Sequence, residues 1–423
     1  MRVPGKRRAL AWPAIVMVAA LGLAGCSGDD GGSAEGSGGS ADLSVLGPDN
    51  KAAGAPIKVG LFNVEGGSTV SQPQIGDAAE AAAKYANDHL GGLNGHAIEI
   101  VRCGDKADGA SAAACANKFV QEKVVAVVAG QPATADQIVP VLLGAGIPWI
   151  GSSPSASSEI TGTGTFFFGS GFIGLLGAWA QYSKDQNYQT VTIYGPDNPQ
   201  LVAAVRAVGA PLFAKVGTDM QLVTVPQGTA DSTSQVQAGL TRNPDAVGVV
   251  ADNTVCQSIL SALQTSGSTV PKMVNSSCVD KSVIDAVGET GIDGAVLFDI
   301  GDTVSDTPEA KLYRAVMGQY APSAETSGIT PVGYLSMLGF VRAVNAGAAA
   351  GDITTPAGVR SAVAAARDVP RPIGDGNTFS CDRSALPQTL VKATICSSQM
   401  MVTKFTGTER GPYSPVDISS VFR

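Results

Sequence analysis

The sequence predicts an α/β fold made of two lobes, each with a mostly parallel β-sheet. Short apolar runs without alternation, such as residues 124–129, are typical of strands buried on both faces of a parallel sheet. These runs alternate with stretches of helical periodicity, which is the pattern of an α/β domain. The pattern restarts after residue 170, and roughly 370 residues beyond the N-terminal region exceed what one hydrophobic core usually serves.

Residues 124–159 form the clearest β-α-β unit of the chain. Gly130 follows the strand at 124–129. A polar loop then leads into a helical stretch whose apolar residues share one face: Ile138, Val141, Leu142 and Ala145. A second short strand begins at Pro148 and continues into GSSPSASSE, with five serines in nine residues. Hydroxyl-rich loops therefore follow both strands, at the sheet edge where open α/β sheets bind small ligands.

The remaining elements are expected in a regular order. The first half contains strands at residues 56–63, 96–103 and 165–171 and helices at 74–89 and 106–121. The second half contains strands at 190–194, 220–225, 246–251, 272–278 and 295–300, and helices at 172–188, 200–214, 232–242 and 254–264. Three helices follow, at 307–320, 330–350 and 355–367, and then a loop-rich tail with short strands at 379–423. No repeat of short period is present, which excludes a solenoid.

The N-terminal region has the features of an export signal. A basic start and an apolar segment at residues 9–23 precede Leu23-Ala24-Gly25-Cys26. This resembles a bacterial lipoprotein signal, so residues 1–25 are expected to be removed and Cys26 to be lipidated; the alternative is an ordinary secretory signal with a chance cysteine. Residues 26–55 are expected to form a Gly/Ser-rich flexible tether. No other stretch reaches the roughly 18 consecutive apolar residues that a membrane span needs.

The net charge and the cysteine content narrow the possible classes of protein further. Removal of the signal, with its four cations, changes the formal net charge from -8 to -12, and an acidic chain without a basic run argues against nucleic-acid binding. Six cysteines remain after Cys26, an even number in an exported protein. Six allow 15 connectivities, of which sequence proximity favours three local bridges: Cys103 with Cys115, Cys256 with Cys278, and Cys381 with Cys396. The alternative, a metal site, lacks a CxxC pair and a neighbouring histidine.

Several short motifs together resemble a known family. PIKVGLF at residues 56–62, GGLNGHAIEIV, Asp105 and the ANKFV helix are similar to type I periplasmic solute-binding proteins, in the branch of the Leu/Ile/Val-binding proteins of ABC importers. The resemblance covers roughly residues 56–410 and implies two Rossmann-like lobes joined by a three-segment hinge. Lobe 1 would comprise residues 56–170 and 301–378, and lobe 2 residues 171–300 and 379–423.

The resemblance also implies where a ligand would sit. In that family, hydroxyls and main-chain amides at strand ends hold an amino acid's carboxylate between the lobes. Thr134 matches a carboxylate-binding hydroxyl at a helix N-terminus, where free N–H groups favour anions. Ser153 and Ser155 match the second strand-end loop. The alternative for each of them is a helix cap or a turn residue.

The opposite lobe departs from the family's pattern. Ser277 stands where the family places an ammonium-binding glutamate, and Asp252 stands near the position of an aromatic that closes the pocket. Asp252 is therefore expected either to replace the missing acid or to cap the following helix. Tyr194 is expected to line the cleft or to pack at the sheet edge. A carboxylate, an amide or a small aromatic acid then fits as well as a branched-chain amino acid.

The sequence therefore predicts a solute receptor and not an enzyme. No GxSxG, Walker or HExxH motif is present. Paired carboxylates among Asp105, Glu159, Asp252 and Asp299 would suit a hydrolase, but nothing in the sequence fixes their separation. We expect a monomeric, lipid-anchored receptor on the extracytoplasmic face of the cell membrane that serves ABC permease and ATPase subunits, without a metal or other cofactor. A ligand-sensing lipoprotein that feeds a signalling partner is the alternative.

Overall fold

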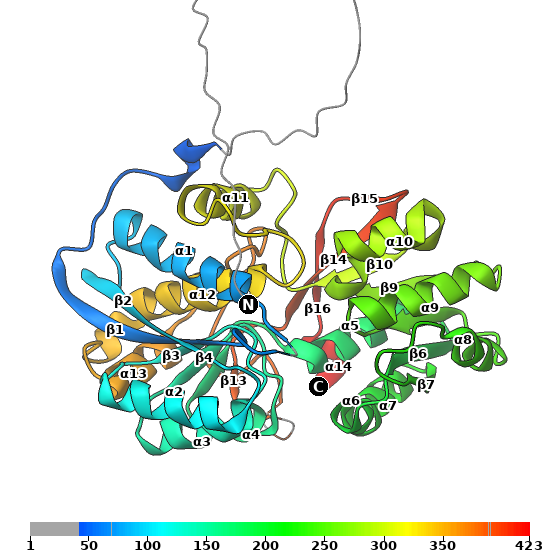
Figure 1. The fold of residues 1–423 in the computed structure, drawn as a ribbon, viewed down its shortest axis with the longest axis horizontal. Helices are drawn as coiled ribbons and strands as arrows, with labels where there is room; N and C mark the ends of the chain where they lie inside the picture. Colours follow the sequence, from blue (N-terminus) through cyan, green and yellow to red (C-terminus); the bar gives the residue numbers. More distant parts are fainter. Residues whose placement is uncertain (1–41, 69, 388, 390) are drawn as a thin grey trace, which may run out of the picture. The chain divides into compact units, whose positions relative to one another are not determined.

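Two β-sheets, each with helices on both faces, organise the chain (Figure 1). The computed structural model describes residues 42–68, 70–387, 389 and 391–423, which fall within one unit, Ala41–Arg423. The predicted signal peptide and Cys26 lie outside the described residues. Among the described residues, no helix has the length and apolar character required to cross a membrane.

The first sheet has six parallel strands in the order β13-β5-β4-β3-β1-β2. Their bounds are β1 Gly54–Asn63, β2 His96–Gly104, β3 Val127–Ala129, β4 Trp149–Gly151, β5 Thr165–Phe167 and β13 Thr394–Ile395. The predicted apolar run at residues 124–129 is buried throughout, with no side chain more than 4% exposed. It therefore lies in the interior of the sheet, as its lack of alternation predicts.

Helices cover both faces of the first sheet. One face packs against α1 (Pro73–His89), α11 (Pro308–Tyr320), α12 (Pro331–Gly347) and α13 (Pro356–Ala365). The other face packs against α2 (Gly109–Gln121) and α3 (Ala135–Gly144), followed in the chain by the short α4 (Ser157–Thr161). Gly333 allows α12 to approach α1 closely, because a Cβ there would collide with the carbonyl of Ile75.

The second sheet runs β15-β14-β10-β9-β8-β6-β7, with β16 paired to β14. The strands β6 to β10 are parallel, whereas β14 is antiparallel to β10. Their bounds are β6 Thr190–Pro196, β7 Asp219–Val225, β8 Ala246–Val249, β9 Lys272–Asn275, β10 Val296–Asp299, β14 Gln399–Thr406, β15 Glu409–Arg410 and β16 Ser414–Asp417.

The helices of the second sheet also divide between its two faces. The apolar cluster on one face includes residues of α5 (Gly171–Asp185), α7 (Ala210–Lys215) and α14 (Ser419–Phe422), and α6 (Pro199–Ala204) leads to α7 through a π-helical turn, Val205–Gly209. The cluster on the other face includes α8 (Thr233–Leu240), α9 (Asn253–Thr265) and α10 (Lys281–Ile292). Short elements complete the fold: the 3-10 turns Leu43–Leu46, Ser276–Val279 and Ala348–Ala350, and the antiparallel pair β11 (Val369–Pro370) and β12 (Thr378–Phe379).

The chain crosses between the sheets three times, after β5, after β10 and after β13. This confirms the predicted α/β fold with two mostly parallel sheets and a three-segment connection. The exact lobe boundaries stay predictions. The structure places β13, from the segment assigned to lobe 2, at the edge of the first sheet, because its backbone pairs with β5.

Residues 42–53, which were assigned to the flexible tether, lie against the first lobe. Asp42 accepts a hydrogen bond from the backbone N of Ser44 and starts the turn Leu43–Leu46, and Leu46 is buried in the core beside α11. The backbone N of Asn50 donates to the carbonyl of Asp88 over 2.8 Å. The folded chain therefore begins before residue 55, because its LSVL segment supplies apolar side chains to the core.

Candidate functional site

A cavity of about 220 Å³ lies where strand ends of both sheets meet. We call it the strand-end cavity. Residues that follow β4 and β5 line it from the first lobe, and residues at the ends of β8, β9 and β10 line it from the second. The full lining is Ser153, Gly169, Ser170, Gly171, Phe172, Leu175, Val250, Asn275, Ser276, Phe298, Ile300, Arg371, Gln399 and Met400. Its position matches the sheet edge at which α/β proteins bind small ligands.

Arg371 is the only charged residue in this lining. Its side chain is 1% exposed and lies in the loop between β11 and β12. Nε donates to the carbonyl of Phe168 over 3.2 Å, and Nη2 donates to the carbonyl of Ile300 over 2.5 Å. Nη1 has no hydrogen-bond partner in the described part of the chain. Burial lowers the pKa of the Arg371 guanidinium to about 10, against the attraction of Asp299.

Asp299, at the end of β10, belongs to the wall behind the cavity. Its Oδ1 accepts from the hydroxyl of Ser276 over 3.0 Å and from the backbone N of Ile300 over 2.7 Å. Burial raises the pKa of the Asp299 carboxyl. Asp299 itself is not part of the lining, whereas Ser276 and Ile300, which donate to it, are.

A second cavity, of about 250 Å³, is almost entirely polar; we call it the polar cavity. The first lobe contributes Gln72 and Gln74 at the start of α1, together with Glu325, Ser327, Gly328 and Ile329. Asn253, Ser277 and Asp280 line it from the second lobe. The two lobes approach closely here, because a Cβ on Gly328 would lie 3.1 Å from Oδ2 of Asp280.

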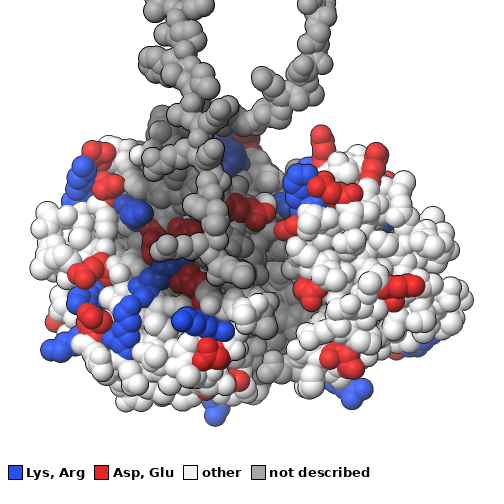
Figure 2. All heavy atoms as spheres, viewed as in Figure 1, with Lys and Arg blue, Asp and Glu red and all other residues white. Residues whose placement is uncertain are grey.

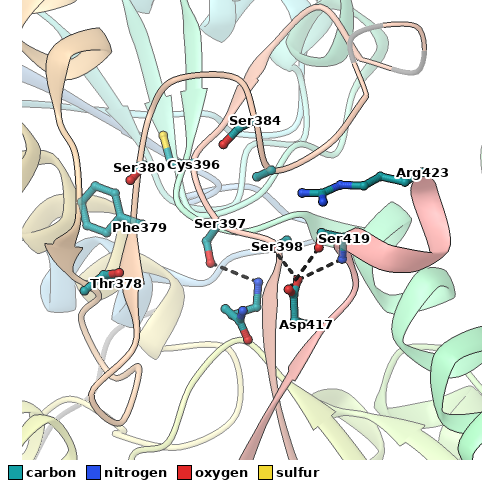
Figure 3. Close-up of a pocket in the computed structure, with 12 residues that line it drawn as sticks. Thr378, Phe379, Ser380, Ser384, Cys396, Ser397, Ser398, Asp417, Ser419 and Arg423 are labelled. Carbon is teal, nitrogen blue, oxygen red and sulfur yellow. Dashed lines mark hydrogen bonds between the residues drawn. The ribbon is translucent and has the colours of Figure 1, made fainter.

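A third cavity, of about 200 Å³, lies along the third crossing and the C-terminal segment (Figure 3). Ser398 and Ser419 point toward Asp417, which accepts 2.7 Å and 3.0 Å hydrogen bonds from their hydroxyls. Ser397 accepts from the backbone N of Gln399 over 3.1 Å. These polar groups already form hydrogen bonds with one another. This arrangement is more typical of a contact between two chain segments than of a ligand-binding site.

Two of the three predicted residues of the first lobe donate hydrogen bonds to carboxylates of the protein, and the third lines a cavity. Thr134, which is buried just before α3, donates its hydroxyl to Oδ1 of Asp105 over 2.7 Å. Ser155 donates its hydroxyl to Oε2 of Glu159 over 3.0 Å, and its backbone N donates to the same oxygen over 2.7 Å. Ser153 lines the strand-end cavity.

The predicted residues of the second lobe lie apart from one another. Tyr194 is fully buried and donates its hydroxyl to the carbonyl of Val236 over 2.9 Å. Asp252 is exposed and caps α9, accepting from the backbone N of Val255 over 3.0 Å. Ser277 lines the polar cavity. The structure therefore divides the predicted set between two cavities, the protein interior and exposed positions next to helix starts, and the ligand-binding roles stay predictions.

Arg371, Ser170 and Ser276 were missed as candidates by sequence reasoning. Ser170 ends the FFFGS run after β5, which is a strand-end position of the kind that favoured Ser153. Arg371 stands between two prolines in a short apolar segment, and a cation so placed is a signal that could have been used.

Three disulfides join the cysteines in the pairs favoured by sequence proximity. Cys103–Cys115 links β2 to α2, Cys256–Cys278 links α9 to the turn after β9, and Cys381–Cys396 links the residues that follow β12 and β13. Over the described residues, no group of three or more His, Cys, Asp or Glu side chains is placed to hold a metal ion. On the face shown in Figure 2, Lys and Arg are interspersed with Asp and Glu.

Two α/β lobes with cavities at facing strand ends and three connecting segments define a bilobed solute-binding protein. The chain belongs to the periplasmic binding protein family, whose model matches residues 56–392. This confirms the resemblance drawn from the sequence. The family comprises substrate-binding proteins of transporters, which act outside the cytoplasm. A search of curated protein sequences gave no match.

Solved structures share the fold at low sequence identity. A leucine-binding protein from Thermotoga maritima has a TM-score of 0.66 at 15% identity, covering 85% of this chain and 99% of that one. The branched-chain amino acid transporter substrate-binding protein LivJ from Streptococcus pneumoniae, solved with isoleucine, has a TM-score of 0.64 at 18% identity, with 85% and 99% covered. A fatty acid ABC transporter substrate-binding protein from Thermomonospora curvata has a TM-score of 0.63 at 16% identity, with 88% and 95% covered.

Proposed function

We propose that this chain is the solute-binding component of an ABC importer, which captures a small solute between its lobes and delivers it to a permease. The strand-end cavity is the observation that carries this proposal, because strand ends of both sheets line it. The solute class is a branched-chain amino acid-like molecule, an amide or a carboxylate. The ligands named for the three structural neighbours described above, leucine, isoleucine and fatty acids, all bear a carboxylate.

The mechanism is closure of the two lobes about the three crossing segments. Closure removes water from Ser153, Asn275 and Ser276. The hydrogen-bonding capacity that these side chains do not use within the protein then needs partners on the solute. A solute that satisfies them stabilises the closed form, so affinity reports how well it complements that form. A permease that recognises only the closed form would then receive loaded protein.

The proposal places the mature protein on the extracytoplasmic face of the cell membrane, as a monomer held by a lipid on Cys26. The sequence Leu23-Ala24-Gly25-Cys26 and the Gly/Ser-rich residues after it support this placement. The protein would then work in water while staying close to its permease.

A thermal-shift screen of amino acids, amides, nucleosides, short peptides and organic acids tests the proposed function. A solute at 100 times its dissociation constant should raise the unfolding free energy by about 2.7 kcal/mol. A shift within one chemical class, confirmed by calorimetry, supports the proposal. No shift with any class would reject the solute-receptor function.

A further inference from the structure

The strand-end cavity holds a buried cation that forms no ion pair with a described carboxylate, although Asp299 attracts it from outside the lining. The Arg371 guanidinium donates two hydrogen bonds to neutral carbonyl oxygens, those of Phe168 and Ile300, while Nη1 has no partner. Arg371 belongs to none of the ion pairs of the described residues. A buried charge outside a direct ion pair is costly to the fold, and a bound anion would lower that cost.

A second unpaired polar group lies in the same lining. Ser170 is 3% exposed, and its hydroxyl has no partner among the described residues. Ser170 directly precedes α5 but its side chain does not cap that helix, which has 15 residues. Backbone N–H groups at such a helix start carry partial positive charge and favour an anion. The guanidinium, the hydroxyl and the helix start all suit a carboxylate.

The rest of the lining offers no partner for an ammonium group of comparable strength. It contains no aspartate or glutamate, and Asp299, which accepts hydrogen bonds from Ser276 and Ile300, lies outside it. Large apolar side chains, including Phe172, Phe298 and Met400, supply the remaining surface. Such a surface favours the apolar part of a solute. A second charge on the solute would find no partner there.

We propose that the strand-end cavity binds a small monocarboxylate with an apolar body, whose carboxylate pairs with Arg371 and Ser170 and which carries no ammonium group. This inference rests on the proposed function and specifies its solute class. Arg371 also connects two of the crossing segments through Phe168 and Ile300, so the bound carboxylate would lie directly beside the hinge.

Calorimetry with matched probes tests the proposal on the full-length mature protein. Isocaproate is leucine without its amine, and isocaproamide is the same body without the charge; benzoate and benzamide form a second pair. We expect at least one acid of the two pairs to bind, and its amide to bind at least tenfold more weakly. We also expect leucine to bind at least tenfold more weakly than isocaproate.

The variant Ser170→Ala separates a ligand role from a structural one. Its hydroxyl has no partner to lose, so the fold should be unaffected, while acid binding should weaken several-fold and amide binding should not change. Ser336→Ala is the matched control, because Ser336 is also buried with an unpaired hydroxyl but lies within α12 and outside the cavity lining. Arg371→Gln should abolish binding of the acid. If that variant does not fold, the comparison of acids with amides and leucine, together with Ser170→Ala, still tests whether the cavity binds a carboxylate.

Each contrary outcome has a distinct meaning. Leucine or an amide that binds as tightly as its acid, or acid binding equal in Ser170→Ala and Ser336→Ala, would overturn the carboxylate assignment and leave Arg371 a structural link. If neither isocaproate nor benzoate binds but the thermal-shift screen finds another solute, the carboxylate assignment is wrong and the proposed receptor function stands. If no class of solute binds, the receptor function fails as well.

Discussion

Thr134 donates its hydroxyl to the buried carboxylate of Asp105, with 2.7 Å between Oγ1 and Oδ1. The same carboxylate accepts hydrogen bonds from the backbone N of Ala133, Thr134 and Ala107. The end of β2 thus fixes the loop that leads from β3 into α3. The hydroxyl that sequence resemblance assigned to a ligand carboxylate already donates its single proton to a carboxylate of the protein.

Thr134→Val should therefore lower the unfolding free energy by about 1.5–3 kcal/mol, since it removes a hydrogen bond to a charged group. Urea unfolding followed by circular dichroism measures this loss. Thr254→Val, at an exposed position near the start of α9, is the control. Unchanged stability together with weaker solute binding would restore the ligand role predicted for Thr134.

Tyr194→Phe should cost about 1 kcal/mol of stability, because it removes the buried hydrogen bond to the carbonyl of Val236. Solute affinity in the folded variant should equal that of the unmodified protein, since Tyr194 packs in the core of the second lobe and lines none of the three cavities. Calorimetry on both proteins checks this. A tenfold loss of affinity would place Tyr194 in the binding site after all.

Glu159 should give the first lobe a distinct pH dependence. Burial raises the pKa of its carboxyl, against the hydrogen bonds that it accepts from Ser155, Ala156 and Trp149. The folded state therefore binds the proton more tightly than the unfolded state, whose pKa is near 4.5. Its contribution to stability is fully present below that value and is lost as the pH rises through the folded pKa.

The measurement compares urea unfolding of the unmodified protein and of Glu159→Gln between pH 4 and pH 8. Glu159→Gln should be less stable at every pH in this range. Its amide N–H would face the indole N–H of Trp149, which would lose its acceptor at a cost of about 1–3 kcal/mol. The difference between the two proteins should widen as the pH falls. A difference that narrows toward low pH would contradict the assigned direction of the pKa shift.

Removing the disulfide between Cys103 and Cys115 by a double change to alanine should destabilise the protein. The bridge closes a loop with a sequence separation of 12 residues, and a loop of this size contributes about 3 kcal/mol through the entropy of the unfolded chain. Unfolding in the absence of reductant measures the loss. Reductant should lower the stability of the unmodified protein by at least as much, and equal stability of the two oxidised proteins would contradict the prediction.

Cys26→Ser should release the protein from the membrane, because serine cannot take the thioether-linked lipid of the expected anchor. Fractionation of cells that express each form measures the distribution. Ser27→Ala, at the next position, should leave it unchanged. Continued membrane retention of Cys26→Ser would indicate a different anchor.

The sequence pattern predicted helices and strands well where the local conformational preference of the residues matches their packing in the fold. The helix at Lys281–Ile292 was missed because Gly288 interrupts it with a φ of 66°. The helix expected at residues 200–214 is instead divided by the π-helical turn Val205–Gly209. Pro211, two residues beyond this turn, lacks the N–H that would bond back into a regular helix.

The candidate site was harder to predict because it depends on long-range contacts. Arg371 meets the carbonyls of Phe168 and Ile300, which are 203 and 71 residues away in the chain. No local spacing encodes such a meeting. The ligand role of the serines near strand ends stays a prediction, and only the fold shows that Ser155 and Thr134 donate hydrogen bonds to Glu159 and Asp105.

The placement of β13 and β14 has a consequence for how the protein is made. Residues 394–417 complete both sheets, since β13 closes the edge of the first while β14 and β16 extend the second beyond β10. A chain synthesised from its N-terminus therefore lacks a finished sheet in either lobe until residues 394–417 have been made. Domains fold as units once their parts are available. We expect the nascent chain to stay incompletely folded until these strands have been made, which suits the proposed export of the protein across a membrane.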